Sequence, residues 1–150
     1  NIMADEMYDV QKNVGYWIRR NYMNFTKIHN NKLAKYDITI SQIGVLVELW
    51  IEDGQTQKQI ADKMAIMPST LTGLLDNLAS KKFITKREDK SDARIKRIFL
   101  TKQGKKFREP SNDVIKEMDS IITADLSEEE KQMIVFWLKK IYQNLIKQDS

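Results

Sequence analysis

The sequence predicts a mainly α-helical fold with one small β-hairpin. Three segments begin with a Ser or Thr that is followed three residues later by a Glu or Gln, and each leads into apolar residues at helical spacing. One stretch after residue 82 instead has β-branched and aromatic residues on both sides of a charged loop, which is the pattern of a hairpin. The 150 residues, 41% of them hydrophobic, suffice for one domain with a core.

The first predicted helix is long and runs from about Ala4 to Lys35. Its apolar residues recur at steps of three and four from Met7 to Ile28, so one apolar stripe follows the whole segment. This length exceeds that of a typical globular helix. We therefore expect part of the stripe to contact another chain.

Two shorter helices follow, each opened by a capping box in which the two side chains bond each other's backbone amides. They are expected over about 40–51, after Thr39 and Gln42, and over about 57–65, after Thr56 and Gln59. A tight turn is expected after the second of these helices.

A fourth helix is expected to begin at Pro68, because proline suits the first helical position, and to end near Lys81. Its leucines fall on one face and leave a polar, almost uncharged face opposite. Two short helices joined by a tight turn, the second with a polar outer face, form a helix-turn-helix. Residues 83–85 and 95–100 then predict the two strands of the hairpin.

The remaining residues predict two more helical segments. Thr101 is expected to cap the first, and Pro110 interrupts it, so we expect a kink, or a break with a restart, near Glu109. Because this helix connects the central part of the fold to the last helix, Pro110 is also a candidate hinge. Ser127 and Glu130 form the third capping box and open a strongly amphipathic last helix.

Positive charge is concentrated in the middle of the chain. Between Gly54 and Arg108 there are fourteen Lys and Arg residues against five Asp and Glu, a net charge of +9, whereas the rest of the chain carries −5. Segregation of this kind favours a polyanionic partner. Since the basic segment holds the helix-turn-helix and the hairpin, the sequence predicts a winged helix-turn-helix lobe that binds double-stranded DNA.

Each part of the predicted winged helix has an expected contact. The second helix can present short polar side chains to the major groove, and Arg94 near the hairpin tip can enter a narrow minor groove. Asp92 either pairs with Arg94 or shapes the turn. The expected residues are Ser69, Thr70, Thr72, Gly73 and Asn77 for the major groove, Asp92 and Arg94 for the minor groove, and Lys86, Arg87, Lys90, Lys96 and Arg97 for phosphates.

The run MPSTLTGLLDNLASKKFITKREDKSDARIKRIFLTKQG resembles the recognition helix and wing of the MarR family of bacterial and archaeal transcription regulators. The segments ITISQIGVL and TQKQIADKM are similar to the family's two preceding helices. The resemblance implies a single domain with a winged-helix lobe over about 39–100 and a helical dimerisation region from 1–38 and 101–150. It also implies a homodimer on a pseudo-palindromic operator, and our hypothesis is that this dimer acts as a repressor. The residues at the family's wing signature are Asp89, Asp92, Arg94, Leu100, Thr101 and Gly104.

Four positions depart from the family's pattern. Lys82 stands where glycine is usual, and a left-handed lysine there would cost about 1 kcal/mol. Gly73 takes a position that is often arginine; it either allows close approach to the DNA backbone or is a substitution that weakens the helix by about 1 kcal/mol. Ala93 and Lys90 replace the usual arginine and proline of the wing tip. The operator sequence therefore does not follow from a relative.

The resemblance further implies that a small ligand, frequently phenolic or anionic, often controls such a protein, and we expect no cofactor. Tyr16, Arg20 and Trp50 are the candidates for lining its pocket, although aromatic residues at helical spacing are usually core. His29 is the only histidine, and no carboxylates at metal-ligand spacing accompany it, so we expect it at the surface.

Other functions find little support in the sequence. Cysteine, a P-loop and a GxGxxG motif are all absent, so we expect no catalytic residue, no metal site and no enzyme activity. No segment approaches the ~18 apolar residues of a membrane span, and the first residues do not resemble a secretion signal, so we expect a cytoplasmic protein. The alternative to a DNA-binding regulator is a winged-helix protein-interaction module whose basic face binds an acidic partner.

Overall fold

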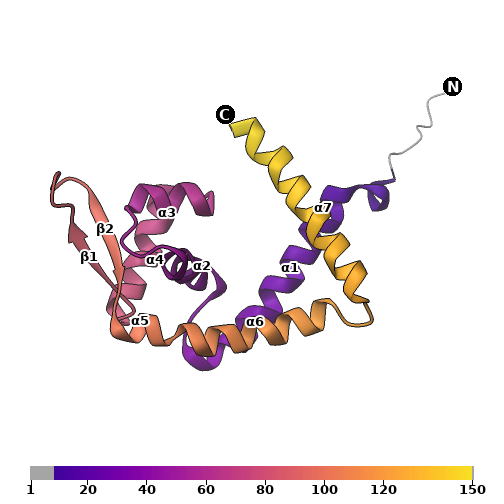
Figure 1. Ribbon diagram of the computed structural model, residues 1–150, viewed down its shortest axis with the longest axis horizontal. Helices are drawn as coiled ribbons and strands as arrows, with labels where there is room; N and C mark the ends of the chain where they lie inside the picture. Colours follow the sequence, from indigo (N-terminus) through magenta and orange to yellow (C-terminus); the bar gives the residue numbers. More distant parts are fainter. Residues whose placement is uncertain (1–8, 150) are drawn as a thin grey trace, which may run out of the picture. The chain divides into compact units, whose positions relative to one another are not determined.

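The computed structural model describes residues 9–149 and contains mostly helices with one two-stranded antiparallel sheet (Figure 1). The chain forms two compact units, with their boundary between Val114 and Ile115. The predicted fold class is confirmed. In chain order the elements are η1 (Val10–Lys12), α1 (Val14–Leu33), η2 (Ala34–Tyr36), α2 (Ile40–Ile51), α3 (Gln57–Met64), α4 (Pro68–Ser80), β1 (Ile84–Glu88), β2 (Lys96–Leu100), α5 (Lys102–Lys106), α6 (Arg108–Ile122), α7 (Glu128–Ile146) and η3 (Lys147–Asp149).

All three predicted capping boxes are present. At the start of α2, Gln42 N donates to Thr39 Oγ1 at 3.3 Å, and Thr39 N donates to Gln42 Oε1 at 3.0 Å. The same reciprocal pairs open α3 and α7. Each box satisfies amides that a helix leaves without a partner at its first turn, which explains why these helices begin where the sequence predicts.

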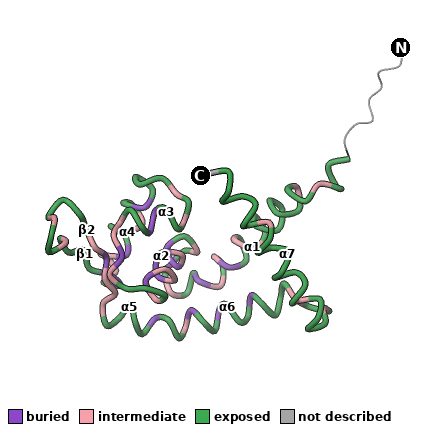
Figure 2. The backbone as a smooth tube through the Cα atoms, turned by 45° about the horizontal axis from the view of Figure 1, so that its top comes forward, coloured by how far each residue is buried: buried purple, intermediate pink, exposed green. Residues whose placement is uncertain are grey.

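The core of the first unit lies where α2, α3 and α4 pack together and meet β2. Figure 2 shows buried residues concentrated along these helices. The leucines of α4 point inward, as their spacing predicts, and leave the polar face of that helix outside. The fully buried residues of these four elements include Leu46, Leu49, Ile60, Leu71, Leu75, Leu78 and Ile98.

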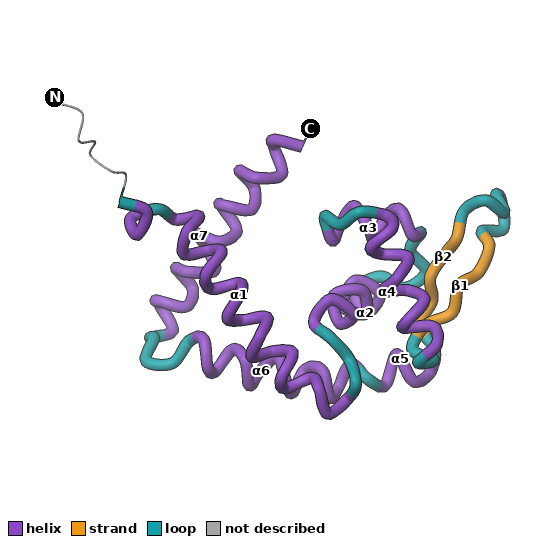
Figure 3. Tube along the Cα trace, turned by 180° about the vertical axis from the view of Figure 1, so that it is seen from behind, coloured by secondary structure: helices purple, strands orange, loops and turns teal. Residues whose placement is uncertain are grey.

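The hairpin is joined to the helices through backbone hydrogen bonds. β1 and β2 pair with Ile84 opposite Leu100 and Glu88 opposite Lys96, and their loop projects beyond the helices (Figure 3). On the other edge of β2, Ile98 N donates to the carbonyl of Gln55 at 2.9 Å. The loop between α2 and α3 therefore acts as a short third strand that fixes the hairpin to the lobe.

The first helix is shorter than predicted. Its expected start at Ala4 lies outside the described residues, and Asn13 adopts an extended conformation between η1 and α1. The Asn13 side chain accepts a hydrogen bond from Tyr16 N at 2.9 Å and so caps α1. The apolar spacing continues across this cap, which is why periodicity alone placed the start too early.

The hairpin is longer than predicted, and its loop is shorter. β1 continues through Lys86 and Arg87 to Glu88, which leaves only residues 89–95 between the strands. Charged residues fit this strand because, after Ile84, every residue of β1 is exposed. A charged run therefore does not identify a loop when only one end of a strand is buried.

The predicted break with a restart is confirmed, at Phe107 rather than Glu109, between α5 and α6. Pro110 lies in the first turn of α6, where its missing N–H would have no helical partner, so the helix accommodates it. Phe107 packs edge-on against Tyr36 and Phe83, with 5.2 Å between ring centres in each pair. These contacts fix the junction of the two helices.

Two single-residue expectations have clear outcomes. Lys82 has a φ of 63°, so the condition under which its cost of about 1 kcal/mol applies is met. The surface position expected for His29 is wrong, because the residue is 5% exposed and packs edge-on against Phe25. Burial lowers the pKa of His29 and favours its neutral form. Within residues 9–149, neither ring nitrogen of His29 has a hydrogen-bond partner.

Two glycines offer a matched test of the packing. A Cβ on Gly104 would lie 2.1 Å from the carbonyl oxygen of Phe83, whereas nothing lies within 4 Å of a Cβ on Gly73. We expect Gly104→Ala to lower the free energy of unfolding by about 1–3 kcal/mol. We expect Gly73→Ala, in the exposed interior of α4, to raise it by about 1 kcal/mol. Urea denaturation measures both changes, and a Gly104→Ala chain as stable as the wild type would contradict the close approach of α5 to Phe83.

Candidate nucleic-acid interface

The outer face of α4 is polar and open to solvent. Leu71, Leu75 and Leu78 are fully buried beneath it, so the helix cannot turn another face outward without losing the core. The predicted major-groove residues all lie on the exposed part of the helix. They are Ser69, Thr70, Thr72, Gly73 and Asn77.

Glutamines of the two preceding helices hold two of these polar groups. From α3, Gln57 Nε2 donates to Thr72 Oγ1 at 2.9 Å, and this hydroxyl donates to the carbonyl of Pro68 at 3.0 Å. From α2, Gln42 Nε2 donates to Asn77 Oδ1 at 2.8 Å. Neither glutamine was among the expected site residues. Gln42 was visible in the sequence only as part of a capping box, a role that uses one end of its amide and leaves the other free.

At the wing tip, Asp92 fixes the direction of Arg94. Arg94 Nε and Nη2 each donate to one oxygen of the Asp92 carboxylate at 3.0 Å, and Arg94 N donates to Oδ1, also at 3.0 Å. These bonds lower the pKa of Asp92. The Arg94 side chain is nonetheless 91% exposed. Both roles considered for Asp92 are observed, since it forms the ion pair with Arg94 and also accepts from the Arg94 backbone N–H within the turn.

Most of the predicted phosphate-binding cations already have partners in the lobe. Since these pairs are at least partly exposed, exchanging a carboxylate for a phosphate costs little. Lys86 pairs with Asp76, and Lys96 Nζ lies 2.9 Å from Glu88 Oε1. The guanidinium carbon of Arg87 lies 4.8 Å from the centre of the Phe99 ring. Lys90 is exposed in the loop.

Arg97 differs from the other cations because it fastens the wing to the lobe. Its Nε donates to the carboxylate of Asp89, and its Nη1 donates to the carbonyl of Gly54 at 3.0 Å. The hydrogen bonds from Arg97, and then those from Ser91, hold the pKa of Asp89 well below its ordinary value of 3.8. The Asp89 side chain is only 10% exposed. A phosphate contact for Arg97 remains a prediction.

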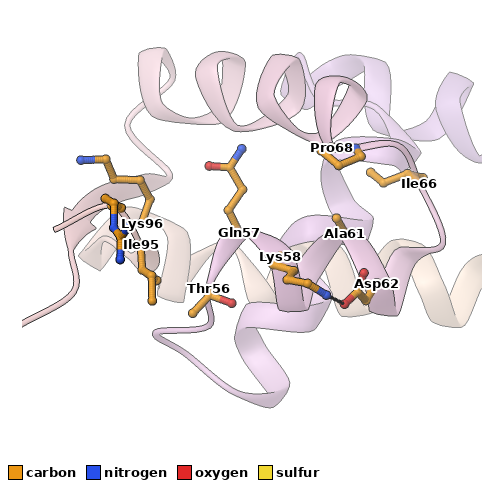
Figure 4. A pocket seen from close by; sticks show the side chains of 10 residues that line it. Thr56, Gln57, Lys58, Ala61, Asp62, Ile66, Pro68, Ile95 and Lys96 are labelled. Carbon is orange, nitrogen blue, oxygen red and sulfur yellow. Dashed lines mark hydrogen bonds and ion pairs between the residues drawn. The ribbon is translucent and has the colours of Figure 1, made fainter. Parts of the chain in front are cut away.

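A pocket of about 530 Å³ lies between the wing, α3 and the start of α4 (Figure 4). Residues 94–96 line it from the wing, Pro68 from α4, and Lys58 and Asp62 from α3, where Lys58 Nζ lies 2.8 Å from Asp62 Oδ2. The wing and the start of α4 are therefore separate surfaces of one lobe with a hollow between them.

The candidate effector residues fall into two places. Tyr16 and Arg20 are one turn apart on α1, and Arg20 Nη1 donates to the Tyr16 hydroxyl at 2.9 Å. Trp50 instead donates from Nε1 to the carbonyl of Gly104 at 3.0 Å, which ties α2 to α5. A shared effector pocket for these three residues remains a prediction.

Two further properties concern the described part of the chain. Between residues 9 and 149, no three His, Cys, Asp or Glu residues are arranged to hold a metal ion. The helices described there are also too short or too polar to cross a membrane.

Comparison with known sequences points to one family. The sequence model of the MarR family matches residues 38–96. The HTH-type transcriptional regulator TtmR of Methylorubrum extorquens is 33% identical over 81 residues, which are 54% of this chain and 42% of TtmR. The HTH-type transcriptional regulator SarZ of Staphylococcus aureus is 28% identical over 88 residues, which are 59% of this chain and 60% of SarZ. The chain thus spans less than two thirds of the length of these two relatives.

Solved structures match over more of the chain. A MarR transcriptional regulator from Methanosarcina mazei Go1 gives a TM-score of 0.86 at 25% identity, over 89% of this chain and 96% of that one. MepR of S. aureus, solved in complex with DNA, gives a TM-score of 0.79 at 32% identity, over 88% of this chain and 97% of that one. The matching region therefore includes the helices on both sides of the winged lobe.

The half-buried ion pair of Asp89 and Arg97 in the wing gives a pH-dependent prediction. We expect Asp89→Asn to speed hydrogen exchange of the β2 amides near neutral pH, because Arg97 loses its charged partner. Because folding lowers the pKa of Asp89, its stabilising effect is complete above 3.8 and is lost as the pH falls through the folded-state pKa. The difference between wild type and variant should therefore shrink in acid.

Glu88→Gln is the matched control for Asp89→Asn. Glu88 is the adjacent acid and also pairs with a β2 cation, but its side chain is 63% exposed, so its removal should change exchange little. Equal exchange in the two variants at every pH would contradict an anchoring role for Asp89.

Proposed function

This chain belongs to the MarR family, and we propose that it is a sequence-specific transcription regulator that binds double-stranded DNA through α4 and the wing. The observation that carries the proposal is the exposed polar face of α4 together with an exposed Arg94 already aligned by Asp92. The DNA complex of MepR, a relative of nearly the same length, supports the same use of the fold here.

The polar face of α4 and the wing suit the two grooves of the duplex. The polar residues of α4 face base edges in the major groove, which accommodates an α-helix. Arg94 enters the minor groove, where narrow A·T-rich stretches concentrate negative potential. The exposed cations of the wing bind phosphates, which supply affinity and register but no sequence information.

A homodimer formed through the N- and C-terminal helices is part of the proposal. A single chain leaves many large apolar residues of α1 and α7 uncovered, and apolar patches of this kind usually mark an interface. A dimer also places two recognition helices on the two halves of a pseudo-palindrome, about one helical turn of DNA apart. The apolar residues of α7 that are at least half exposed are Met133, Val135, Phe136, Trp137, Leu138, Tyr142 and Leu145.

Repression is the mode of regulation that we propose, since a dimer bound across a promoter excludes other proteins from the same DNA. Release by a small phenolic or anionic effector is proposed with it, and Tyr16 and Arg20 are the residues that such a ligand would contact on α1. A protein with this function acts in the cytoplasm, where bacterial and archaeal DNA is found.

Arg94→Ala tests the role of the wing. We expect affinity for the preferred DNA site to fall by about tenfold or more, which is the usual scale for removing one specific interaction with DNA. The slope of log K against log salt should fall by about 0.9 for each phosphate that the variant no longer neutralises. Fluorescence anisotropy at several salt concentrations measures both quantities.

Arg19→Ala is the control for lost charge, because Arg19 is an exposed arginine that is not among the residues proposed to contact DNA. It removes the same charge and should leave the affinity nearly unchanged. If Arg94→Ala and Arg19→Ala bind the site equally well, the wing has no part in recognition. If the wild-type chain binds no duplex even at low salt, the acidic protein partner becomes the better explanation of the basic face.

A further inference from the structure

The orientation of the Asn77 side chain can be derived from its hydrogen bonds. An asparagine amide presents two N–H donors on one side and an acceptor oxygen on the other, and which side faces a ligand depends on how the amide is turned. The oxygen and nitrogen of such a group are distinguished by the network around them. At Asn77, the network begins at a backbone N–H, a group that can only donate.

The chain of hydrogen bonds runs through Gln42. Thr39 N donates at 3.0 Å to one end of the Gln42 amide, so that end must be the oxygen, Oε1. The other end of the same amide is then Nε2, a donor. It lies 2.8 Å from the Asn77 amide, so the Asn77 atom that faces it must be the acceptor, Oδ1. The capping box of α2 thereby fixes the rotation of a side chain on α4.

The consequence is that Asn77 turns its donors away from the lobe. Gln42 is 6% exposed and cannot itself reach a duplex, whereas Asn77 lies on the exposed face of α4. Within residues 9–149, no hydrogen bond uses Asn77 Nδ2. An outward NH₂ group with an occupied oxygen behind it suits an acceptor on a ligand. It suits adenine less well, because an asparagine binds adenine with its oxygen and its nitrogen together, and Gln42 holds this oxygen toward the lobe.

We propose that Gln42 is a positioning residue that turns Asn77 to bind a hydrogen-bond acceptor of DNA, and so sets part of the base preference without touching the duplex. This inference rests on the proposed function. In the major groove, the acceptors without a neighbouring donor on the same base are those of guanine (O6 and N7) and thymine (O4). A phosphate oxygen offers the same chemistry outside the grooves.

Two substitutions replace the outward-facing donor at position 77 with an acceptor, each in a different way. In Gln42→Glu, both oxygens of the introduced carboxylate only accept, so Asn77 must donate to it and turn its own oxygen outward. Glutamate serves a capping box as well as glutamine does, so Thr39 N keeps its partner. In Asn77→Asp, one oxygen accepts from Gln42 and the other faces outward. Both variants therefore present an acceptor where the wild type presents a donor.

Gln59→Glu is the matched control. Gln59 holds the same position in the capping box of α3, where Thr56 N donates to its Oε1 at 2.8 Å. The substitution adds the same charge at the same place in a neighbouring helix. No hydrogen bond within residues 9–149 joins Gln59 to α4, so it should leave base preference unchanged.

The test selects bound duplexes from randomised DNA with the full chain and with each variant, and then measures affinities for the selected sites. We expect wild type and Gln59→Glu to prefer guanine or thymine at one position of each half-site. We expect Gln42→Glu and Asn77→Asp to prefer adenine or cytosine there, because these bases present amino donors. The ratio of affinities should change by about tenfold.

The alternative outcomes separate the acceptor from the proposal itself. A uniform loss of affinity on every sequence in Gln42→Glu and Asn77→Asp, beyond that in Gln59→Glu, would support a phosphate oxygen as the acceptor. Identical preference and affinity in all three variants would overturn the inference while leaving the regulator in place. If the wild type selects no sequence, the proposed function fails and this inference fails with it. Thermal unfolding verifies that Gln42→Glu is folded, and Asn77→Asp, at an exposed position, tests the same point without a buried substitution.

Discussion

The winged lobe depends on the hydrogen bonds of Gln55, a buried residue between α2 and α3. Its Nε2 donates to the carbonyls of Glu48 and Glu52 at 2.7 Å each, at the end of α2, where the Glu48 carbonyl also accepts from Glu52 N at 2.9 Å. Its own carbonyl accepts from Ile98 of the hairpin. Thr56 follows directly and caps α3. Two adjacent residues therefore end one helix, begin the next and hold the wing, so the positions of all three elements are coupled.

The sequence predicted the parts of the fold that depend on local chemistry. The capping boxes placed the starts of α2, α3 and α7 correctly, because each box is complete within four residues. The errors occurred where apolar spacing or charge was the only signal. The apolar periodicity continues across the cap at Asn13, so the start of the first helix was predicted too early. The charged residues of β1 were assigned to a loop, because this strand is buried at one end only. The burial of His29 did not follow from its residue type, because histidines are found both in cores and at surfaces.

In the candidate site, too, local features were predicted from the sequence and contacts between helices were not. Exposure of the polar α4 residues followed from the leucine spacing, and the Asp92–Arg94 pair was one of two roles that their proximity in sequence left open. The contacts from Gln42 and Gln57 to α4 did not follow from the sequence, since they join residues on different helices that only the folded core brings together. Residues that touch a ligand are thus easier to recognise in a sequence than residues that orient them.

The ion pairs of the wing also bear on how such a protein would find its site. Because carboxylates such as Asp76 and Glu88 already occupy Lys86 and Lys96, the free lobe attracts a random duplex less than its cations alone would. Competing sites in a genome number about 10⁶ or more, and weak retention on each of them shortens the time lost there. Only a site that also contacts α4 and Arg94 offsets the free energy of breaking these ion pairs. Internal charge neutralisation in the wing would therefore shorten the search for an operator as well as steady the hairpin.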